Sequence, residues 1–288
     1  MFENGLLAGK RVLITGGATG LGKSIGRRYV ELGADLVVCG RREAMLEAAA
    51  NELRTELGAR IETHVCDVRS AEAVEAMMGR IFESRPLDIL VNNAAGNFIA
   101  QTQKLSPRAV DAVLGIVLHG TAYCTIACGR RWIAAGRPGT VLSILTLSAL
   151  QGAPFTVPSA MAKAGVLAMT RSLAVEWGPK GIRLVAIAPG PFPTPGAWGR
   201  LMPEERRAEA PGHIQGHIPL RRYGEHLELA NLASYLVSDH AAYITGECVV
   251  IDGGKRYLGG AGTGSAAMLD WSDAQWAAIR EKTKGDKA

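Results

Sequence analysis

Five residues with the spacing of an anion-binding turn stand directly after the first short apolar run of the chain, residues 11–15. They are Gly16, Thr19, Gly20, Leu21 and Gly22, and an amphipathic stretch follows them. Backbone N–H groups approach an anion closely where glycine has no side chain, and the N-terminus of a helix favours negative charge. A strand, a glycine turn and a helix in this order predict a site for the pyrophosphate of a dinucleotide.

Two arginines, Arg41 and Arg42, stand where a second strand should end, about 20 residues beyond the glycine turn. An NAD-selective site would place a carboxylate here, on the ribose 2′-hydroxyl. A guanidinium instead suits the 2′-phosphate of NADP, which it can bind through two parallel hydrogen bonds. The alternative is that both arginines begin a solvated helix, but the absence of an acid favours NADP(H). Asp67, at the end of the third expected strand, is a candidate acceptor for the adenine amine.

Short β-branched apolar runs alternate with longer amphipathic stretches along most of the chain. The runs predict strands at residues 11–15, 35–39, 61–65, 88–91, 140–145, 182–187 and 247–251. The longer stretches predict helices at residues 21–32, 42–57, 71–84, 107–135, 158–177 and 225–238. This alternation requires a parallel sheet covered by helices on both faces. We therefore expect an α/β, doubly wound Rossmann fold with a seven-stranded parallel sheet.

Residues 189–222 break the alternation with seven prolines and several glycines. An insertion of this length is typical of a functional loop, so we expect a substrate lid within a single domain of residues 1–258. Residues 259–288 are expected to form a glycine-rich linker and a short helical tail, in which Ser272 and Gln275 have the spacing of a capping box. Docking of this tail on a second subunit is one of several roles that its composition allows.

The composition of the 288 residues limits the classes of function. No run approaches the roughly 18 apolar residues of a membrane span, and the amino terminus lacks the apolar core of a signal peptide. We therefore expect a soluble, cytoplasmic protein without a membrane contact. A net charge of +5, spread along the chain, favours an anionic small ligand over nucleic acid. The five cysteines are scattered, which favours reduced core residues over a disulfide framework or a metal site.

Four motifs in this order resemble the short-chain dehydrogenase/reductase family. They are the turn TGGATGLG, the run Asn92-Asn93-Ala94-Ala95-Gly96 after the fourth expected strand, Lys163 within a helix, and Pro189-Gly190 after the sixth strand. The resemblance covers about residues 8–258. It implies a nicotinamide coenzyme, a lysine that binds the nicotinamide ribose, and a homo-oligomer, by family a tetramer. The further coenzyme-binding residues that it implies are Val68, Asn93, Ala94, Pro189, Gly190 and Thr194.

Two positions depart from the pattern of most of that family. Ser159 stands four residues before Lys163, where most members have a tyrosine as general acid/base, and Val117 aligns with the usual active-site asparagine. An aliphatic hydroxyl cannot be poised near neutral pH as a phenol beside a cationic lysine can. Ordinary ketone reduction would therefore lose its proton donor.

A branch with serine at this place, the 2,4-dienoyl-CoA reductases, is similar to the chain over longer segments. These are residues 92–99, Val157-Pro158-Ser159-Ala160, Lys163-Ala164-Gly165, residues 188–191 and residues 196–201. The resemblance implies NADPH-dependent conversion of a 2,4-dienoyl-CoA to a 3-enoyl-CoA through a dienolate, as in fatty-acid β-oxidation. It further implies that Lys163 orients the coenzyme, that Ser159 lies near the thioester, and that Phe98 and Arg200 contact the acyl-CoA substrate.

Two further positions differ from the mitochondrial type of this branch. Ser148 aligns with its catalytic tyrosine, and His119 aligns with an asparagine donor. Either residue could donate a hydrogen bond to the dienolate, or His119 could be structural and the hydroxyls of Ser143, Thr146 and Ser148 could satisfy backbone groups after a strand. Two alternative functions stay open: an oxidoreductase of another acyl thioester or carbonyl, and an NADP-binding scaffold without catalysis.

Overall fold

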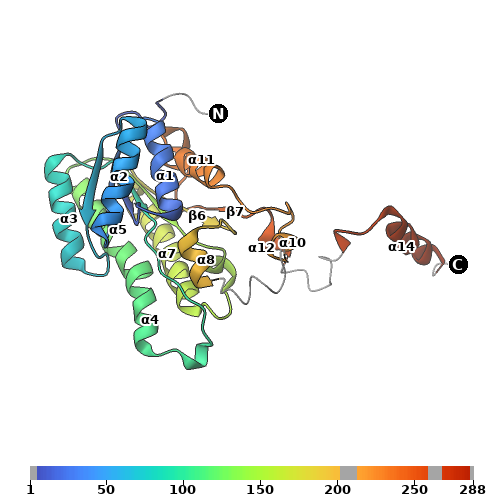
Figure 1. The fold of residues 1–288 in the computed structure, drawn as a ribbon. Helices are drawn as coiled ribbons and strands as arrows, with labels where there is room; N and C mark the ends of the chain where they lie inside the picture. The colour runs from blue at the N-terminus through green and yellow to red at the C-terminus, as the bar shows by residue number, and fades with distance from the viewer. Residues whose placement is uncertain (1–4, 202–212, 259–267, 286–288) are drawn as a thin grey trace.

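Seven parallel strands form one sheet in the order β3-β2-β1-β4-β5-β6-β7. The computed structural model describes residues 5–201, 213–258 and 268–285 (Figure 1). The strands are β1 (Arg11–Thr15), β2 (Asp35–Gly40), β3 (Ile61–Val65), β4 (Ile89–Asn92), β5 (Gly139–Ile144), β6 (Ile182–Pro189) and β7 (Cys248–Ile251). Each agrees with a predicted strand to within two residues at either end, and the predicted fold class is confirmed.

Helices cover both faces of this sheet, because successive side chains of a strand point to opposite faces. In β1, Val12 and Ile14 pack with α1, α2 and α11, whereas Leu13 packs with α3, α5 and α7. These helices are α1 (Gly20–Glu31), α2 (Glu43–Leu57), α3 (Ala71–Ser84), α5 (Gly120–Ala134), α7 (Val157–Trp177) and α11 (His226–Val237). The strands at the centre are buried on both sides, which explains their continuous apolar runs.

The helix predicted at residues 107–135 has an irregular middle. It runs as α4 (Pro107–Leu114), a π-helical segment at Gly115–His119, and α5. Among the described residues, the stretch Pro107–Ala134 is the one that could cross a membrane by length and composition, a test that core helices also pass. Cys124, Cys128 and Trp132 of this stretch lie in the core against the sheet.

Short elements complete the described chain: η1 (Thr102–Lys104), α6 (Ser148–Gln151), η3 (Gly178–Lys180), α8 (Pro195–Leu201), α10 (His213–Gly216), η4 (Asp239–Ala241) and α12 (Lys255–Leu258). Both α8 and α10 belong to the predicted lid, whose residues 202–212 lie outside the described part. The predicted terminal helix is α14 (Asp273–Gly285), and it lies apart from the main body (Figure 1). Its capping box is present, since Ser272 N–H donates to Gln275 Oε1 at 2.8 Å and Gln275 N–H donates to Ser272 Oγ at 3.4 Å.

Candidate active site

The candidate residues converge at the carboxyl edge of the sheet. The strand order reverses between β1 and β4, and ligands of open α/β sheets bind in the crevice outside the carboxyl ends at such a point. The glycine turn follows β1 directly, Asn93 follows β4, and Lys163 contacts the end of β5. The topology therefore brings together residues far apart in the sequence.

A network of hydrogen bonds holds the glycine turn to the end of β4. The N–H groups of Asn93 and Ala94 both donate to the Thr15 hydroxyl at 3.0 Å. The Asn93 amide donates to the carbonyls of Thr15, at 3.0 Å, and Gly16, at 3.2 Å. A Cβ atom on Gly22 would lie 2.7 Å from the Gly16 carbonyl, so a larger residue would displace the turn. The structure thus gives Asn93 and Gly22 a clear part in shaping the turn.

The N-terminus of α1 is open to an anion. Thr19 is its N-cap but makes no side-chain capping bond, and no acidic residue lies in the first turn. The first N–H groups of a helix have no partner within the helix, and the helix dipole favours negative charge beside them. The turn around Gly20 and Leu21 therefore fits a pyrophosphate in both its donors and its charge.

The end of β2 presents two cationic side chains. Arg41 and Arg42 are both exposed, and Arg42 is the N-cap of α2. Asp67 lies near them, and its pKa is lowered first by a hydrogen bond from Arg69 and also by the charge of Arg41. Arg69 holds this carboxylate with Nη2–Oδ2 at 2.5 Å, a contact that no local sequence pattern predicts. Asp67 can accept from an adenine amine only beside this bound guanidinium. The neighbouring Val68 is buried.

Lys163 is buried in α7, and its ammonium donates to the backbone carbonyl of Ile144 at the end of β5. Burial lowers the pKa of Lys163 from its ordinary value of 10.5 to about 8, because the charged form loses its hydration. Ser159 precedes Lys163 by one helical turn and is only 5% exposed. Its hydroxyl has no hydrogen-bond partner within the described part of the chain, whereas the hydroxyl of Thr170 in the same helix bonds to Val166. Ser159 Oγ is not among the fully buried polar atoms that lack a partner, so it is accessible from outside and open to a ligand.

A pair of hydroxyls follows β5. Thr146 Oγ1 and Ser148 Oγ lie 2.5 Å apart, and Ser148 begins α6. Ser143, the residue before the last one of β5, is buried. Ser148 was singled out from the sequence, but its partner Thr146 was considered only as part of a hydroxyl-rich stretch. The hydrogen bond between the two hydroxyls uses one of their two hydrogens, so the other can be donated to an acceptor.

His119 ends the π-helical segment and is exposed, with its ring centroid 6.2 Å from that of Tyr123. Val117, two residues earlier, is buried with Val113 and Ala162, and Phe98 packs against this cluster. Phe98 therefore forms an apolar wall between α4 and α7. No hydrogen bond joins His119 to Lys163 or Ser159 within the described residues, so its catalytic role stays a prediction.

The segment after β6 crosses the glycine turn. Pro189 ends β6, and the N–H of Gly190 donates to the Ile251 carbonyl at 2.8 Å. A Cβ atom on Gly20 would lie 3.5 Å from Cγ2 of Thr194, so the threonine side chain lies against the turn. Arg200, in α8, is exposed and donates to the carbonyl of Gly196 at 3.2 Å.

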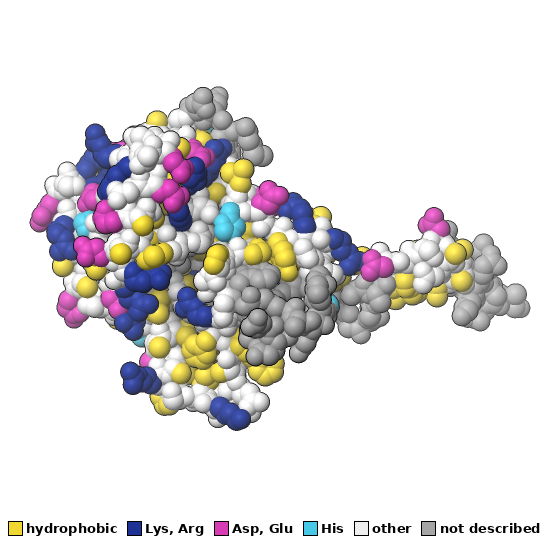
Figure 2. All heavy atoms as spheres, in the orientation of Figure 1, with side chains coloured by type: hydrophobic (Ala, Val, Ile, Leu, Met, Phe, Trp, Pro, Cys, Tyr) yellow, Lys and Arg dark blue, Asp and Glu magenta, His cyan; other side chains and the backbone are white. Residues whose placement is uncertain are grey.

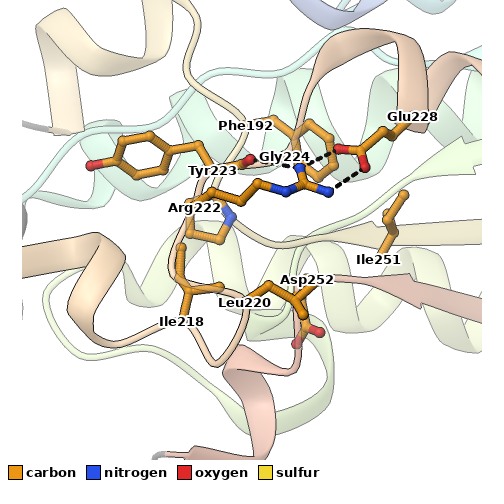
Figure 3. Close-up of a pocket in the computed structure, with 11 residues that line it drawn as sticks. Phe192, Ile218, Leu220, Arg222, Tyr223, Gly224, Glu228, Ile251 and Asp252 are labelled. Carbon is orange, nitrogen blue, oxygen red and sulfur yellow. Dashed lines mark hydrogen bonds and ion pairs between the residues drawn. The ribbon is translucent and has the colours of Figure 1, made fainter. Parts of the chain in front are cut away.

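A small cavity of about 70 Å³ lies at the base of the lid (Figure 3). Phe192, Ile218 and Ile251 line it, and Arg222 binds Glu228 at its side through contacts of 2.7 and 2.8 Å. The cavity has room for about two water molecules, which excludes a coenzyme or a CoA thioester. It marks where the lid packs on the sheet.

Charge is spread rather than concentrated on the visible face. Figure 2 shows Lys and Arg side chains distributed over several elements, with acidic side chains among them. Among the residues that the structure describes, no three His, Cys, Asp or Glu side chains form a group that could hold a metal ion.

Comparisons with protein families and curated proteins agree on one family. A family model described as Enoyl-(Acyl carrier protein) reductase matches residues 16–256. An uncharacterized oxidoreductase of Caenorhabditis elegans is 41% identical over 98% of this chain and 90% of its own length. A probable 2,4-dienoyl-CoA reductase of the same species, named as producing (3E)-enoyl-CoA, is 38% identical over 99% of this chain and 93% of its own. A probable 2,4-dienoyl-CoA reductase of Bacillus subtilis, named as producing (2E)-enoyl-CoA, is 42% identical over 85% and 96%.

Solved structures lead to the same family. A short-chain dehydrogenase from Bacillus anthracis has a TM-score of 0.77 and 42% identity, covering 86% of this chain and 96% of that one. A protein from Beutenbergia cavernae, described as an NAD(P)-dependent gluconate 5-dehydrogenase with bound NADP, has a TM-score of 0.81 and 28% identity over 88% of this chain and all of that one. The resemblance stated from the motifs, to the family and to its dienoyl-CoA reductase branch, is confirmed.

Proposed function

Because the chain belongs to the short-chain dehydrogenase/reductase family of oxidoreductases, we propose that it is an NADPH-dependent reductase that converts a 2,4-dienoyl-CoA to a 3-enoyl-CoA. The observation that supports this most strongly is the hydroxyl of Ser159, one helical turn before Lys163, which makes no hydrogen bond to another described residue and stays open to a ligand. A phenol at this place would support carbonyl reduction, whereas a serine suits a substrate whose oxygen needs hydrogen bonds but no immediate proton.

The proposed reaction adds a hydride to the δ-carbon of the conjugated thioester. Bound NADPH would supply this hydride. The electron pairs of the diene then shift toward the thioester, and negative charge collects on its oxygen as a dienolate. The Ser159 hydroxyl, with the pair of Thr146 and Ser148 after β5, can donate hydrogen bonds to that oxygen. A water molecule finally protonates the α-carbon, which leaves the remaining double bond between the β- and γ-carbons.

The coenzyme and substrate would bind across the carboxyl edge of the sheet. The pyrophosphate of the coenzyme would lie at the open N-terminus of α1, and the 2′-phosphate of the coenzyme would lie beside Arg41 and Arg42. Lys163, held by the Ile144 carbonyl, would bind the nicotinamide ribose. Phe98 would contact the acyl chain, and Arg200 a phosphate of CoA.

The chain would then act in fatty-acid β-oxidation, in the cytoplasm, as a homotetramer. Exposed apolar residues on α5 and α7, such as Ile126, Met161 and Val175, support association with further copies. Light scattering should give a mass four times the 30.4 kDa of one chain. A mass of one chain would contradict the oligomer.

A direct assay tests the proposed activity. Purified protein mixed with NADPH and 2,4-hexadienoyl-CoA should consume both chromophores in equal amounts. The Lys163→Met variant is the control. It should lose turnover, although the residues proposed to contact the acyl-CoA, Phe98 and Arg200, are unchanged. Tight NADPH binding without turnover of dienoyl-CoA of any chain length would contradict the reductase and favour a scaffold. Turnover of a different acyl thioester alone would favour another oxidoreductase, in which His119 could transfer the proton.

A further inference from the structure

One histidine outside the proposed site bridges two segments that contact it. The ring of His226, the first residue of α11, lies 2.8 Å from Ser24 Oγ through Nδ1 and 2.8 Å from the Pro193 carbonyl through Nε2. Ser24 belongs to α1, one turn after Gly20, and its Oγ is 3.2 Å from the Gly20 carbonyl. The imidazole therefore joins the helix of the glycine turn to the segment after β6.

The partners fix which nitrogen donates. A carbonyl oxygen only accepts, so Nε2 of His226 must have the hydrogen and donate it to Pro193. In the neutral ring Nδ1 then accepts, so the Ser24 hydroxyl donates its single hydrogen to it. Both ring nitrogens are in use.

The segment after β6 is also held by contacts with Gly224. The N–H of Gly224 donates to the Pro191 carbonyl at 3.1 Å, and the Phe192 ring packs so closely on Gly224 that no Cβ atom would fit there. Figure 3 shows Phe192 and Gly224 side by side at the base of the lid. His226 supplies the next attachment, at Pro193.

Thr194 directly follows Pro193, the residue that His226 holds. Its side chain lies against Gly20, and its hydroxyl accepts from the Ala197 N–H at 3.3 Å at the start of α8. A displacement of the Pro193 carbonyl would therefore move Thr194 away from the glycine turn and shift α8, in which Arg200 lies.

Thr194 follows β6, whereas Arg41 and Asp67, the candidates for the adenine half, follow β2 and β3 on the other side of the point where the strand order reverses. We infer that His226 is a positioning residue, which holds Thr194 at the glycine turn and thereby sets the affinity for the nicotinamide half of the coenzyme. This inference rests on the proposed dinucleotide binding and on no particular substrate. A merely structural role would instead weaken the whole dinucleotide site, because α1 itself would lose support through Ser24.

Three substitutions separate the two contacts. The longer amide of His226→Gln can still donate to Pro193, whereas the shorter amide of His226→Asn reaches only toward Ser24, and His226→Ala reaches neither. His240→Gln is the matched control, since His240 is exposed in η4 and takes no part in the bridge. The probes are NADPH and 2′,5′-ADP, which is the adenine half of the coenzyme alone.

We expect His226→Ala and His226→Asn to weaken NADPH binding about fivefold, which corresponds to one lost hydrogen bond. Binding of 2′,5′-ADP should stay unchanged, and His226→Gln should restore most of the NADPH affinity. Equal losses for both probes would overturn the inference, as would unchanged NADPH binding in His226→Ala. If the wild-type protein prefers NADH, the coenzyme proposal fails, and NADH with AMP tests His226 separately.

Discussion

At the scale of single residues, the chemistry of the site depends on two neighbours in α7. The Ser159 hydroxyl makes no hydrogen bond to another described residue, and Lys163 places a buried ammonium on the Ile144 carbonyl. The replacement of a tyrosine by Ser159 was readable from the motif alone. The hydrogen bond of Lys163 and its lowered pKa were not, because they depend on how deeply α7 packs against β5.

The lowered pKa of Lys163 predicts a pH dependence of stability. Below about pH 8 the side chain is charged in both the folded and the unfolded protein, and the folded protein bears the cost of burying that charge. Between about 8 and 10.5 the folded protein has released this proton while the unfolded chain retains it, so stability rises with pH in this window.

The measurement is the difference in Tm between the coenzyme-free wild-type protein and Lys163→Met. This difference should move in favour of the wild type as the pH rises from 7.5 to 10, while other titrating groups cancel between the two proteins. A constant difference would contradict the buried cation.

Arg41 predicts the choice of coenzyme. Arg41→Ala should weaken NADPH binding roughly tenfold or more, the size of a lost hydrogen bond to a charged group, and should hardly change NADH binding. Arg60→Ala is the control, because Arg60 is also exposed but precedes β3, at the opposite edge of the sheet. Titration of both coenzymes by fluorescence measures the ratio. Equal losses for NADPH and NADH would refute the role in binding the 2′-phosphate.

At the scale of elements, the seven strands and the main helices could be predicted because apolar periodicity marks them directly. Short features could not be predicted in this way. The π-helical segment at Gly115–His119 lies inside a continuous apolar stretch, where a wider turn leaves no signal of its own. The pairing of Arg69 with Asp67 and the bridge at His226 depend on contacts between elements, which no local pattern shows.

The packing of α5 on α7 predicts a stability effect that can be checked by thermal unfolding. A Cβ atom on Gly129 would meet the Trp177 ring, which is buried and cannot move aside easily. Gly129→Ala should therefore destabilise the protein by about 1–3 kcal/mol. Gly178→Ala is the matched control, since its Cβ atom would meet nothing within 4 Å and its φ of −52° is helical. An unchanged Tm in Gly129→Ala would contradict the close approach of these helices.

At the scale of the whole molecule, the parallel sheet gathers the ends of β1, β4 and β5 at one edge, where coenzyme and substrate can meet. The relatives are named for two different products, a (3E)-enoyl-CoA and a (2E)-enoyl-CoA. The carbon that takes the proton decides the product isomer, and we expect this to depend on how the donors around the thioester oxygen hold the dienolate. Neither the fold nor the family determines this outcome.

The most direct measurement uses NADPH with deuterium in its transferable position and 2,4-hexadienoyl-CoA, followed by identification of the product by NMR. The account predicts a 3-enoyl-CoA with deuterium on the δ-carbon and a solvent-derived proton on the α-carbon. A 2-enoyl-CoA would contradict protonation at the α-carbon, and deuterium on the carbonyl carbon would contradict the dienolate that Ser159 and Lys163 are proposed to support.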